Sequence, residues 1–194
     1  MTTSTDSSPW SWLEDTYWYV PPESLPALRF DKDGNSLTWL VDQTVWHITG
    51  YGLGYFWGVC SALLRDAGEE VPERGPGSQP RGFTMLGSIT PEGGVHLTFI
   101  PSSPGSATIG TGRMVPHRGD WSFEMQMSTG VGSQTNAHWA YMVRIRPGDP
   151  SWDSLPGIGL SVPQMLEGLE PPKAEPAAES RRAQSRLPST GSGG

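Results

Sequence analysis

VDQTVWHITGYGLGYFWGVCSALL, residues 41–64, places two aromatic and aliphatic runs on either side of the glycine-rich segment GYGLG. A dinucleotide-binding fingerprint needs a strand, the spacing G-x-G-x-x-G and then a helix that offers its N–H groups to a pyrophosphate. Here the glycines fall at 50, 52, 54 and 58, and Tyr55, Phe56 and Trp57 follow. Bulky aromatic residues are typical of strands. The stretch therefore predicts a β-hairpin rather than a phosphate-binding loop.

Glycine can adopt positive φ without steric cost, as a tight turn requires. A turn centred near Gly52 predicts that Trp46 lies opposite Gly58 and that His47 lies opposite Trp57. The register depends on the centre of the turn, because a slip moves every side chain.

The rest of the chain shows the same pattern of short strands at hairpin spacing. An Asp-Gly turn lies between Phe30 and Leu37, whereas VPPESLPAL (20–28) is broken by prolines and is expected to cross the surface or an open end. Such runs without an amphipathic helix among them are typical of a meander that closes on itself. We predict an all-β fold, a single antiparallel barrel. The further strands are expected at 83–90, 95–100, 107–115, 121–127 and 137–146.

Composition separates one folded domain from two polar ends. Only 35% of the 194 residues are hydrophobic, and the aromatic residues are concentrated between Trp10 and Trp152. A barrel domain over 10–164 with a disordered lead (1–9) and a disordered Pro/Ala/Ser/Gly-rich tail (165–194) explains this distribution. The motif LPSTG (187–191) matches the sortase pattern LPxTG, but no apolar segment and basic tail follow it. We expect a chance match or an added tag.

Charge and cysteine content exclude several classes of protein. The formal net charge is −7, and no cluster of basic residues runs through the predicted domain, so a nucleic-acid partner is not expected. No apolar run approaches the roughly 20 residues of a membrane-spanning helix, and the N-terminus lacks the features of a signal peptide. Cys60 is the single cysteine, which fits a reducing compartment and is expected to be a small buried hydrophobe. We predict a cytoplasmic protein with no membrane partner.

Alternation along the strands assigns inward faces, because alternate residues share a side. In each strand the more apolar set is expected to face inwards, so that the interior is rich in Trp, Phe, Met and Tyr. The inward sets are Phe83, Met85, Gly87 and Ile89; Val95, Leu97 and Phe99; Trp121, Phe123, Met125 and Met127; and Trp139, Tyr141, Val143 and Ile145.

Three polar residues are each expected on the apolar face of their own strand. Asp42 shares a face with Thr44 and Trp46, and a carboxylate desolvated among aromatics could serve as a general acid or base; alternatively, it starts the strand in solvent. Tyr141 could orient a ligand through its hydroxyl or be an ordinary core tyrosine. Arg113 could bind an anionic ligand bidentately or lie on the surface.

Other candidates are weaker. Glu124, His138 and His96 lie on the polar faces of their strands, and His117 sits in a turn, so solvated roles are expected. His47 cannot share a strand face with Asp42, which excludes a simple Asp–His pair within that segment. No spacing suits a zinc site or a serine hydrolase, so neither a metal nor a cofactor is predicted.

The order of features resembles that of the lipocalin-like, or calycin, barrels over about residues 12–146. The segment WLEDTYWYV (12–20) is similar to their opening strand, and the resemblance implies that Trp18 closes the barrel floor. Tyr17 and Tyr19 are similar to the Tyr-x-Tyr pair of phenolic acid decarboxylases in the same group, which implies proton-transfer roles for them. Because Tyr55 and Phe56 stand where those enzymes have an arginine, decarboxylation is kept only as an analogy.

The function predicted from the sequence is a cofactor-independent enzyme acting on a small hydrophobic or aromatic molecule by proton transfer, of the lyase, isomerase or cyclase kind. Alternatives are a non-catalytic carrier with the same pocket and a barrel filled by its own side chains. The tryptophan-rich faces could equally form a homodimer contact. The predicted catalytic residues are Asp42, Tyr141, Tyr17 and Tyr19, and the predicted substrate-binding residues are Trp18, Trp46, Tyr55, Trp57, Met85, Phe99, Arg113, Phe123, Met125 and Trp139.

Overall fold

The hairpin at GYGLG is present in the computed structural model, which describes residues 8–68, 79–130 and 133–174. Strands β3 (Ser36–Gly52) and β4 (Tyr55–Asp66) are joined by Leu53 and Gly54, whose φ angles are 53° and 83°. Two central residues with positive φ form the type I′ turn that suits the twist of a two-residue hairpin. The predicted hairpin is therefore confirmed.

The predicted register of this hairpin is wrong by two residues. Trp46 lies opposite Cys60, and Gly58 lies opposite Ile48. The turn is centred between Leu53 and Gly54 rather than at Gly52, and a bulge between Ile48 and Gly50 shifts the pairing again. A bulge of this kind adds one unpaired residue to one strand and increases the local twist.

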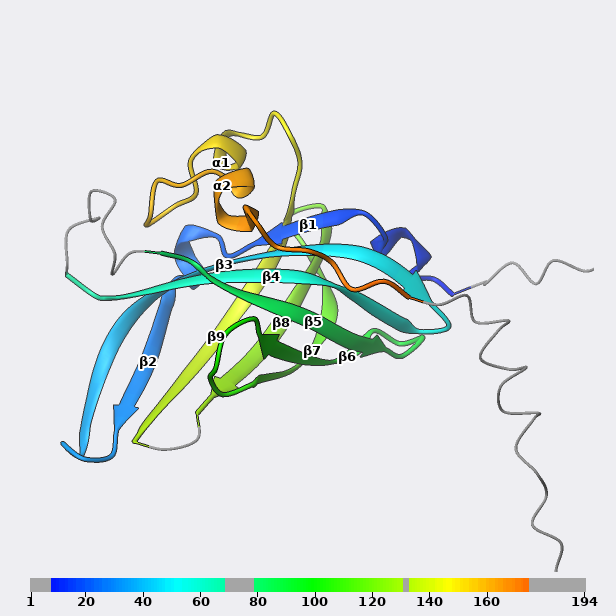
Figure 1. Ribbon diagram of the computed structural model, residues 1–194. Coiled ribbons are helices and arrows are strands. Elements are labelled where there is room, and N and C mark those ends of the chain that lie inside the picture. Colours follow the sequence, from blue (N-terminus) through cyan, green and yellow to red (C-terminus); the bar gives the residue numbers. More distant parts are fainter. Residues whose placement is uncertain (1–7, 69–78, 131–132, 175–194) are drawn as a thin grey trace, which may run out of the picture.

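The following strands form a meander that closes into a single antiparallel barrel of eight strand positions (Figure 1). Each strand pairs with the next along the chain, and the last returns to the first position. Within the described residues, closure gives the strands a neighbour on both sides, apart from the break in the first position, and so reduces the edge at which sheets aggregate. The strands after β4 are β5 (Arg81–Ile89), β6 (Gly94–Pro101), β7 (Thr108–His117), β8 (Asp120–Thr129) and β9 (Gln134–Ile145).

Two short strands share the first position of the barrel, between β3 and β9. β1 (Thr16–Tyr19) pairs with both neighbours near one end, and β2 (Pro26–Asp31) pairs with both near the other. The break between them contains Pro21 and the 3₁₀ helix η2 (Pro22–Ser24). Proline has no N–H for a β-ladder, so the chain leaves the sheet here and returns after Leu25. The prediction that 20–28 lies outside the sheet is correct for the break and wrong for β2.

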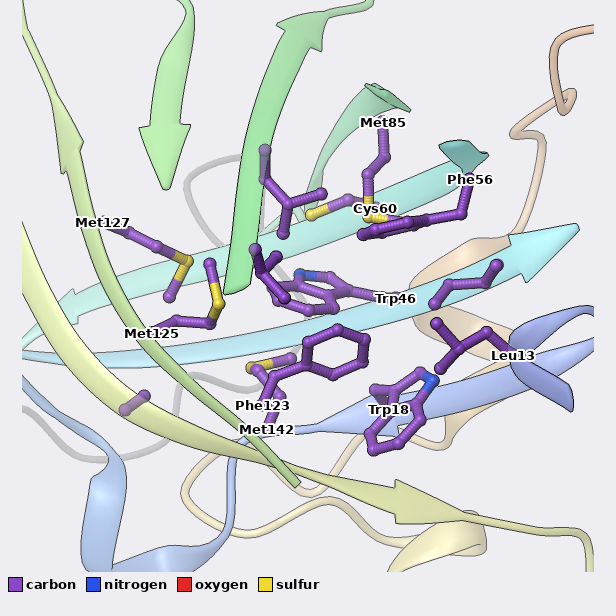
Figure 2. Close-up of a cluster of buried hydrophobic side chains, with 14 of the residues drawn as sticks. Leu13, Trp18, Trp46, Phe56, Cys60, Met85, Phe123, Met125, Met127 and Met142 are labelled. Carbon is purple, nitrogen blue, oxygen red and sulfur yellow. The ribbon is translucent and has the colours of Figure 1, made fainter. Parts of the chain in front are cut away.

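Aromatic and methionine side chains fill one end of the barrel (Figure 2). Trp18 packs edge-on against Phe123 with a centroid distance of 4.6 Å, and Trp46 packs against the same ring at 5.4 Å. The chain that precedes β1, including the 3₁₀ helix η1 (Ser11–Leu13), covers this end. There Trp10 is buried and donates its indole N–H to the carbonyl oxygens of Thr90 and Pro91. This end is therefore closed to solvent and fully packed.

A second apolar cluster lies on the outside of the wall. Helices α1 (Pro150–Asp153) and α2 (Val162–Leu166) follow β9 and lie over one side of the barrel (Figure 1). Their segment buries the outer faces of Val45 and Leu63. The predicted boundary after residue 164 falls within α2, whereas residues 1–7 and 175–194, including LPSTG, lie outside the described residues. The other members of the cluster are Ile145, Leu155, Ile158, Val162 and Met165.

Candidate functional site

A cavity of about 400 Å³ occupies the end of the barrel opposite the packed aromatic core. It opens where β4 leads to β5, β6 to β7, and β8 to β9, because residues of all three connections line it. Its size lies within the range of about 300–1,000 Å³ that is usual for small-molecule pockets. The cavity is thus a natural place for a ligand.

Asp42 lies in the wall of this cavity, on the inward face of β3. Asp42 as a whole is only 9% exposed, because its side chain points into the barrel from the interior of the long strand β3. Oδ1 accepts a hydrogen bond of 2.8 Å from the hydroxyl of Thr44, and Oδ2 lies 3.0 Å from Nδ1 of His138. The predicted inward orientation of Asp42 is correct, and its chemical role stays a prediction.

His138 is held on both sides. Its Nε2 lies 2.6 Å from the carbonyl oxygen of Ser24 in η2, and its Nδ1 faces Asp42 at a distance suited to an ion pair, although the angle is not that of a well-aligned hydrogen bond. Burial lowers the pKa of His138, but the adjacent carboxylate of Asp42 and the carbonyl of Ser24 outweigh burial and raise the pKa above its ordinary value. A carbonyl can only accept, so Nε2 is the donor.

The two contacts define the charge state of the pair. Nε2 donates to Ser24 and Nδ1 faces a carboxylate, so the surroundings favour the imidazolium form of His138, in agreement with the raised pKa. In that form the ring has no lone pair with which to accept a proton from a ligand. An ionised carboxylate offers about four acceptor positions, so Asp42 retains capacity beyond its contacts with Thr44 and His138. Asp42 is therefore the acceptor that this pair can present to a bound molecule.

Cys60 also lines the cavity, on the neighbouring strand β4. It is 3% exposed. Burial, and after it the nearby charge of Asp42, raise the pKa of the Cys60 thiol well above its ordinary value. A neutral thiol is a poor nucleophile, so the residue contributes apolar surface, as predicted for a small buried hydrophobe.

The predicted inward face of β9 is wrong. His138, Ala140 and Met142 point into the barrel and are buried, whereas Trp139 is 48% exposed on the outside. Tyr141 also lies on the outer face, where it stacks on His117 at a centroid distance of 4.7 Å. Both faces of this strand carry apolar residues, and the two aromatics are accommodated by packing against each other and against His117 on the surface.

Five further residues predicted in the pocket lie outside it. Tyr17 stacks on His47 at 4.0 Å on the outer face of β1 and β3, and Tyr19 packs against the cluster beneath α1 and α2. Tyr55 is 59% exposed, and Trp57 lies on the outer face and covers Gly50. Arg113 is directed outwards to Glu124, with Nε 2.7 Å from Oε2. The barrel wall separates each of them from the cavity.

The remaining predicted residues face inwards, but most of them belong to the packed end. Trp18, Trp46, Met85, Phe123 and Met125 are fully buried in the core shown in Figure 2, and none of them is among the residues that line the cavity. Phe99 alone among the predicted substrate-binding residues lines it. Most of the buried aromatic side chains therefore form the packed closed end of the barrel and do not line the cavity.

Sequence reasoning missed several residues of the cavity wall. His138 was assigned to a solvated face, and Arg29 lies on β2, which was not predicted as a strand. The position of His138 could have been recognised from the sequence. Gln134, Asn136 and His138 occupy alternate positions of β9 and therefore share a face with Ala140, which points inwards. A polar set near the mouth that becomes apolar with depth is the pattern of a strand that lines an open cavity.

No protein-family model, curated protein or solved structure matches the chain. Within the described residues, no group of three or more His, Cys, Asp and Glu side chains could hold a metal ion. The described helices are all too short or too polar to cross a membrane.

Proposed function

We propose that the protein binds one small molecule at the open end of its barrel and that Asp42 accepts a hydrogen bond or a proton from that molecule. Eight-stranded barrels of the lipocalin kind are wide enough to hold one small ligand. Here the packed core closes one end, and a cavity of about 400 Å³ remains at the other. The architecture supports binding from the open end.

The observation that carries the proposal is the Asp42–His138 ion pair in the cavity wall. Its side chains are 12% and 4% exposed, and the nearest atoms are 3.0 Å apart. Removing two charges from water is costly, and well-packed apolar residues of similar volume are often at least as stable. A buried, charged pair that faces a cavity is therefore a candidate functional site rather than an ordinary element of the core.

Proton transfer would use the two residues unequally. Asp42 would accept a proton from an acidic C–H, N–H or O–H group of the bound molecule and later return it, as a general base does. The imidazolium of His138 would position the carboxylate through the contact between Nδ1 and Oδ2. Reactions that move a proton without a redox change, such as isomerisation, cyclisation or elimination, fit these groups.

Binding without catalysis is the second candidate. Asp42 contacts Thr44 and His138, and His138 also contacts Ser24, so the pair has partners without any ligand. A carrier could use this satisfied pair only to orient its ligand. The substitution Asp42→Asn separates the candidates, because it would abolish turnover of a substrate but leave the binding of a carried molecule within a fewfold range.

Binding can be tested by filling the cavity. Ala62 lines it on β4, whereas Leu86 is exposed on the outer face of β5. The variants Ala62→Trp and Leu86→Trp add an indole inside and outside the barrel, respectively. We expect the fluorescent probe 1-anilinonaphthalene-8-sulfonate to bind one-to-one to the wild type and to Leu86→Trp, and at least tenfold more weakly to Ala62→Trp.

Leu64→Trp, at a cavity position that is 37% exposed, provides the same test if Ala62→Trp does not fold. Equal binding by the cavity variants and the wild type, or no binding by the folded wild type, would overturn the proposal. Native mass spectrometry of gently purified protein would, in addition, identify a retained ligand.

A further inference from the structure

The wall of the cavity is divided into a polar arc and an apolar arc. The polar arc comprises the contiguous strands β9, β2 and β3, which contribute Asn136, His138, Arg29, Asp42 and Thr44. The apolar arc runs from β4 to β8 on the other side of the barrel. Its apolar contributors are Ala62, Phe83, Phe99, Pro101 and Met127. The same strands also contribute the exposed Arg81 and the hydroxyls of Thr108 and Thr129, which contact each other.

The two arcs face each other because the barrel is closed. β4 to β8 follow one another around the barrel, and β9, β2 and β3 complete the circle. Phe83 and Phe99 occupy inward positions on the adjacent strands β5 and β6. A molecule between the arcs would meet aromatic and thioether surface on one side and hydrogen-bonding atoms on the other.

The donors that lie next to Asp42 are engaged within the protein, whereas two acceptors of the polar arc keep capacity for a ligand. The hydroxyl of Thr44 and the N–H groups of His138 are directed at Asp42 and Ser24. The guanidinium of Arg29 contacts Asp66 with Nη2 2.7 Å from Oδ1. The carboxylate of Asp42 keeps acceptor capacity, and Oδ1 of Asn136 is buried without a hydrogen-bond partner. The complementary ligand edge therefore carries O–H or N–H groups.

The charge of the arc favours a neutral donor. As an ion pair with Nδ1 3.0 Å from Oδ2, His138 and Asp42 together carry no net charge. A ligand ammonium would lie close to the imidazolium and be repelled by it, whereas a ligand carboxylate would meet Asp42. A phenolic hydroxyl or a ring N–H avoids both conflicts. Aromatic faces in the opposite arc pack well against a flat ring.

We infer that the ligand of this cavity is a neutral, flat ring molecule with its O–H or N–H donors on one edge. This inference rests on the proposed binding function and specifies its ligand class. The ring lies against Phe83 and Phe99, and the donor edge faces Asp42. An apolar molecule without a donor would shield Asp42 from water and leave its remaining acceptor capacity unused.

Three naphthalene probes of similar size test the inference by isothermal titration calorimetry. We expect 2-naphthol to bind about tenfold more tightly than 2-methylnaphthalene, because a hydrogen bond to a charged group contributes about that much. We also expect 2-naphthol to bind more tightly than 2-naphthylmethylamine, which is a cation at neutral pH. Asp42→Asn should reduce the preference for 2-naphthol over 2-methylnaphthalene to less than threefold.

Asp33→Asn is the matched control, because Asp33 is an exposed carboxylate in the turn between β2 and β3 and does not line the cavity. It should leave the preference unchanged. Equal binding of 2-naphthol and 2-methylnaphthalene, with both blocked by Ala62→Trp, would overturn the ligand class but retain the binding function. Tightest binding of the amine would overturn the argument from charge. If the folded wild type bound none of the probes, the binding function would fail as well.

Discussion

His138 and Asp42 meet across a gap in the barrel wall, with Nδ1 and Oδ2 3.0 Å apart. Their strands, β9 and β3, are not neighbours at this level, because the first strand position lies between them and is broken from Val20 to Leu25. The break also supplies the second contact of the imidazole, the carbonyl oxygen of Ser24. The prolines that interrupt the first strand are thus directly connected to the charged pair of the cavity.

The pair makes a pH-dependent contribution to stability. The pKa of His138 is raised in the folded protein. The stabilisation that protonated His138 provides is therefore complete below the pKa of the unfolded chain, about 6.5, and is lost as pH rises through the pKa of the folded protein. We expect His138→Gln to lower the free energy of unfolding by about 3 kcal/mol at pH 6, because it leaves Asp42 without its cation. The difference in the free energy of unfolding between His138→Gln and the wild type should become smaller at higher pH.

Urea unfolding of both proteins between pH 5.5 and pH 9 measures this difference. Parallel stability profiles would show that His138 carries no extra proton in the folded state. His96→Gln, a change at an exposed histidine on β6, serves as the control and should not alter the profile.

Gly58 lies opposite the bulge in the β3–β4 hairpin and is required there. A Cβ atom at this position would lie 1.9 Å from the carbonyl oxygen of His47 on the opposite strand. We expect Gly58→Ala to destabilise the protein by at least about 2 kcal/mol, since overpacking forces the backbone apart. In Gly52→Ala the nearest atom is 4.0 Å away, so little change is expected. Thermal unfolding of the two variants compares them, and equal melting temperatures would refute the requirement at Gly58.

Trp10 holds the N-terminal segment against the closed end. It is 5% exposed, packs edge-on against Trp121 and donates to the β5–β6 turn. Trp10→Ala should lower the free energy of unfolding by about 3–5 kcal/mol. Trp10→Phe should cost less, because it keeps one aromatic ring and loses the hydrogen bonds and part of the buried ring surface. Guanidinium unfolding measures both, with Trp39→Ala, at a 62% exposed site, as the control; similar losses in Trp10→Ala and the control would contradict the role.

Met165 tests whether the segment after β9 belongs to the same cooperative unit. It is 2% exposed and packs in the cluster that covers Val45 and Leu63. Met165→Ala should lower the free energy of unfolding by about 2–5 kcal/mol. The exposed neighbour Glu167 provides the control, since Glu167→Ala is expected to change stability by less than about 0.5 kcal/mol. A separate, earlier transition that left the barrel intact would show that α2 unfolds independently.

Sequence patterns predicted the barrel because hairpin turns and alternation are local properties. The inward face of β8 could be assigned to Phe123, Met125 and Met127, since polar residues alternate with them. On β9 the same rule failed, because Trp139 and Tyr141 are apolar and yet pack on the surface. Choosing between the faces required knowledge of what lies opposite, and that information is not local.

The site was predictable only in part for the same reason. Asp42 was identified from its inward companions on one strand. Its partner His138 lies on the last strand. It was assigned to solvent because Trp139 and Tyr141, beside it in the sequence, indicated that the opposite face of the strand points inwards. Asp42 and His138 are each other's charged partner. Neither residue, considered alone in the sequence, therefore indicates a buried ion pair. Pairing across a barrel depends on closure and register, which short sequence windows do not encode.

The pairing of β1 with β9 has a consequence for synthesis of the chain. Tyr17 lies opposite Ile145, so the first strand obtains its second neighbour only when the last has left the ribosome. Until then β1 and β2 present an unpaired edge, and long-range closure of this kind is slow. A nascent chain of this protein must therefore carry an open strand edge through most of its translation. Exposure of this edge during synthesis, a property that the stability of the finished barrel does not report, is therefore part of the cost of this topology.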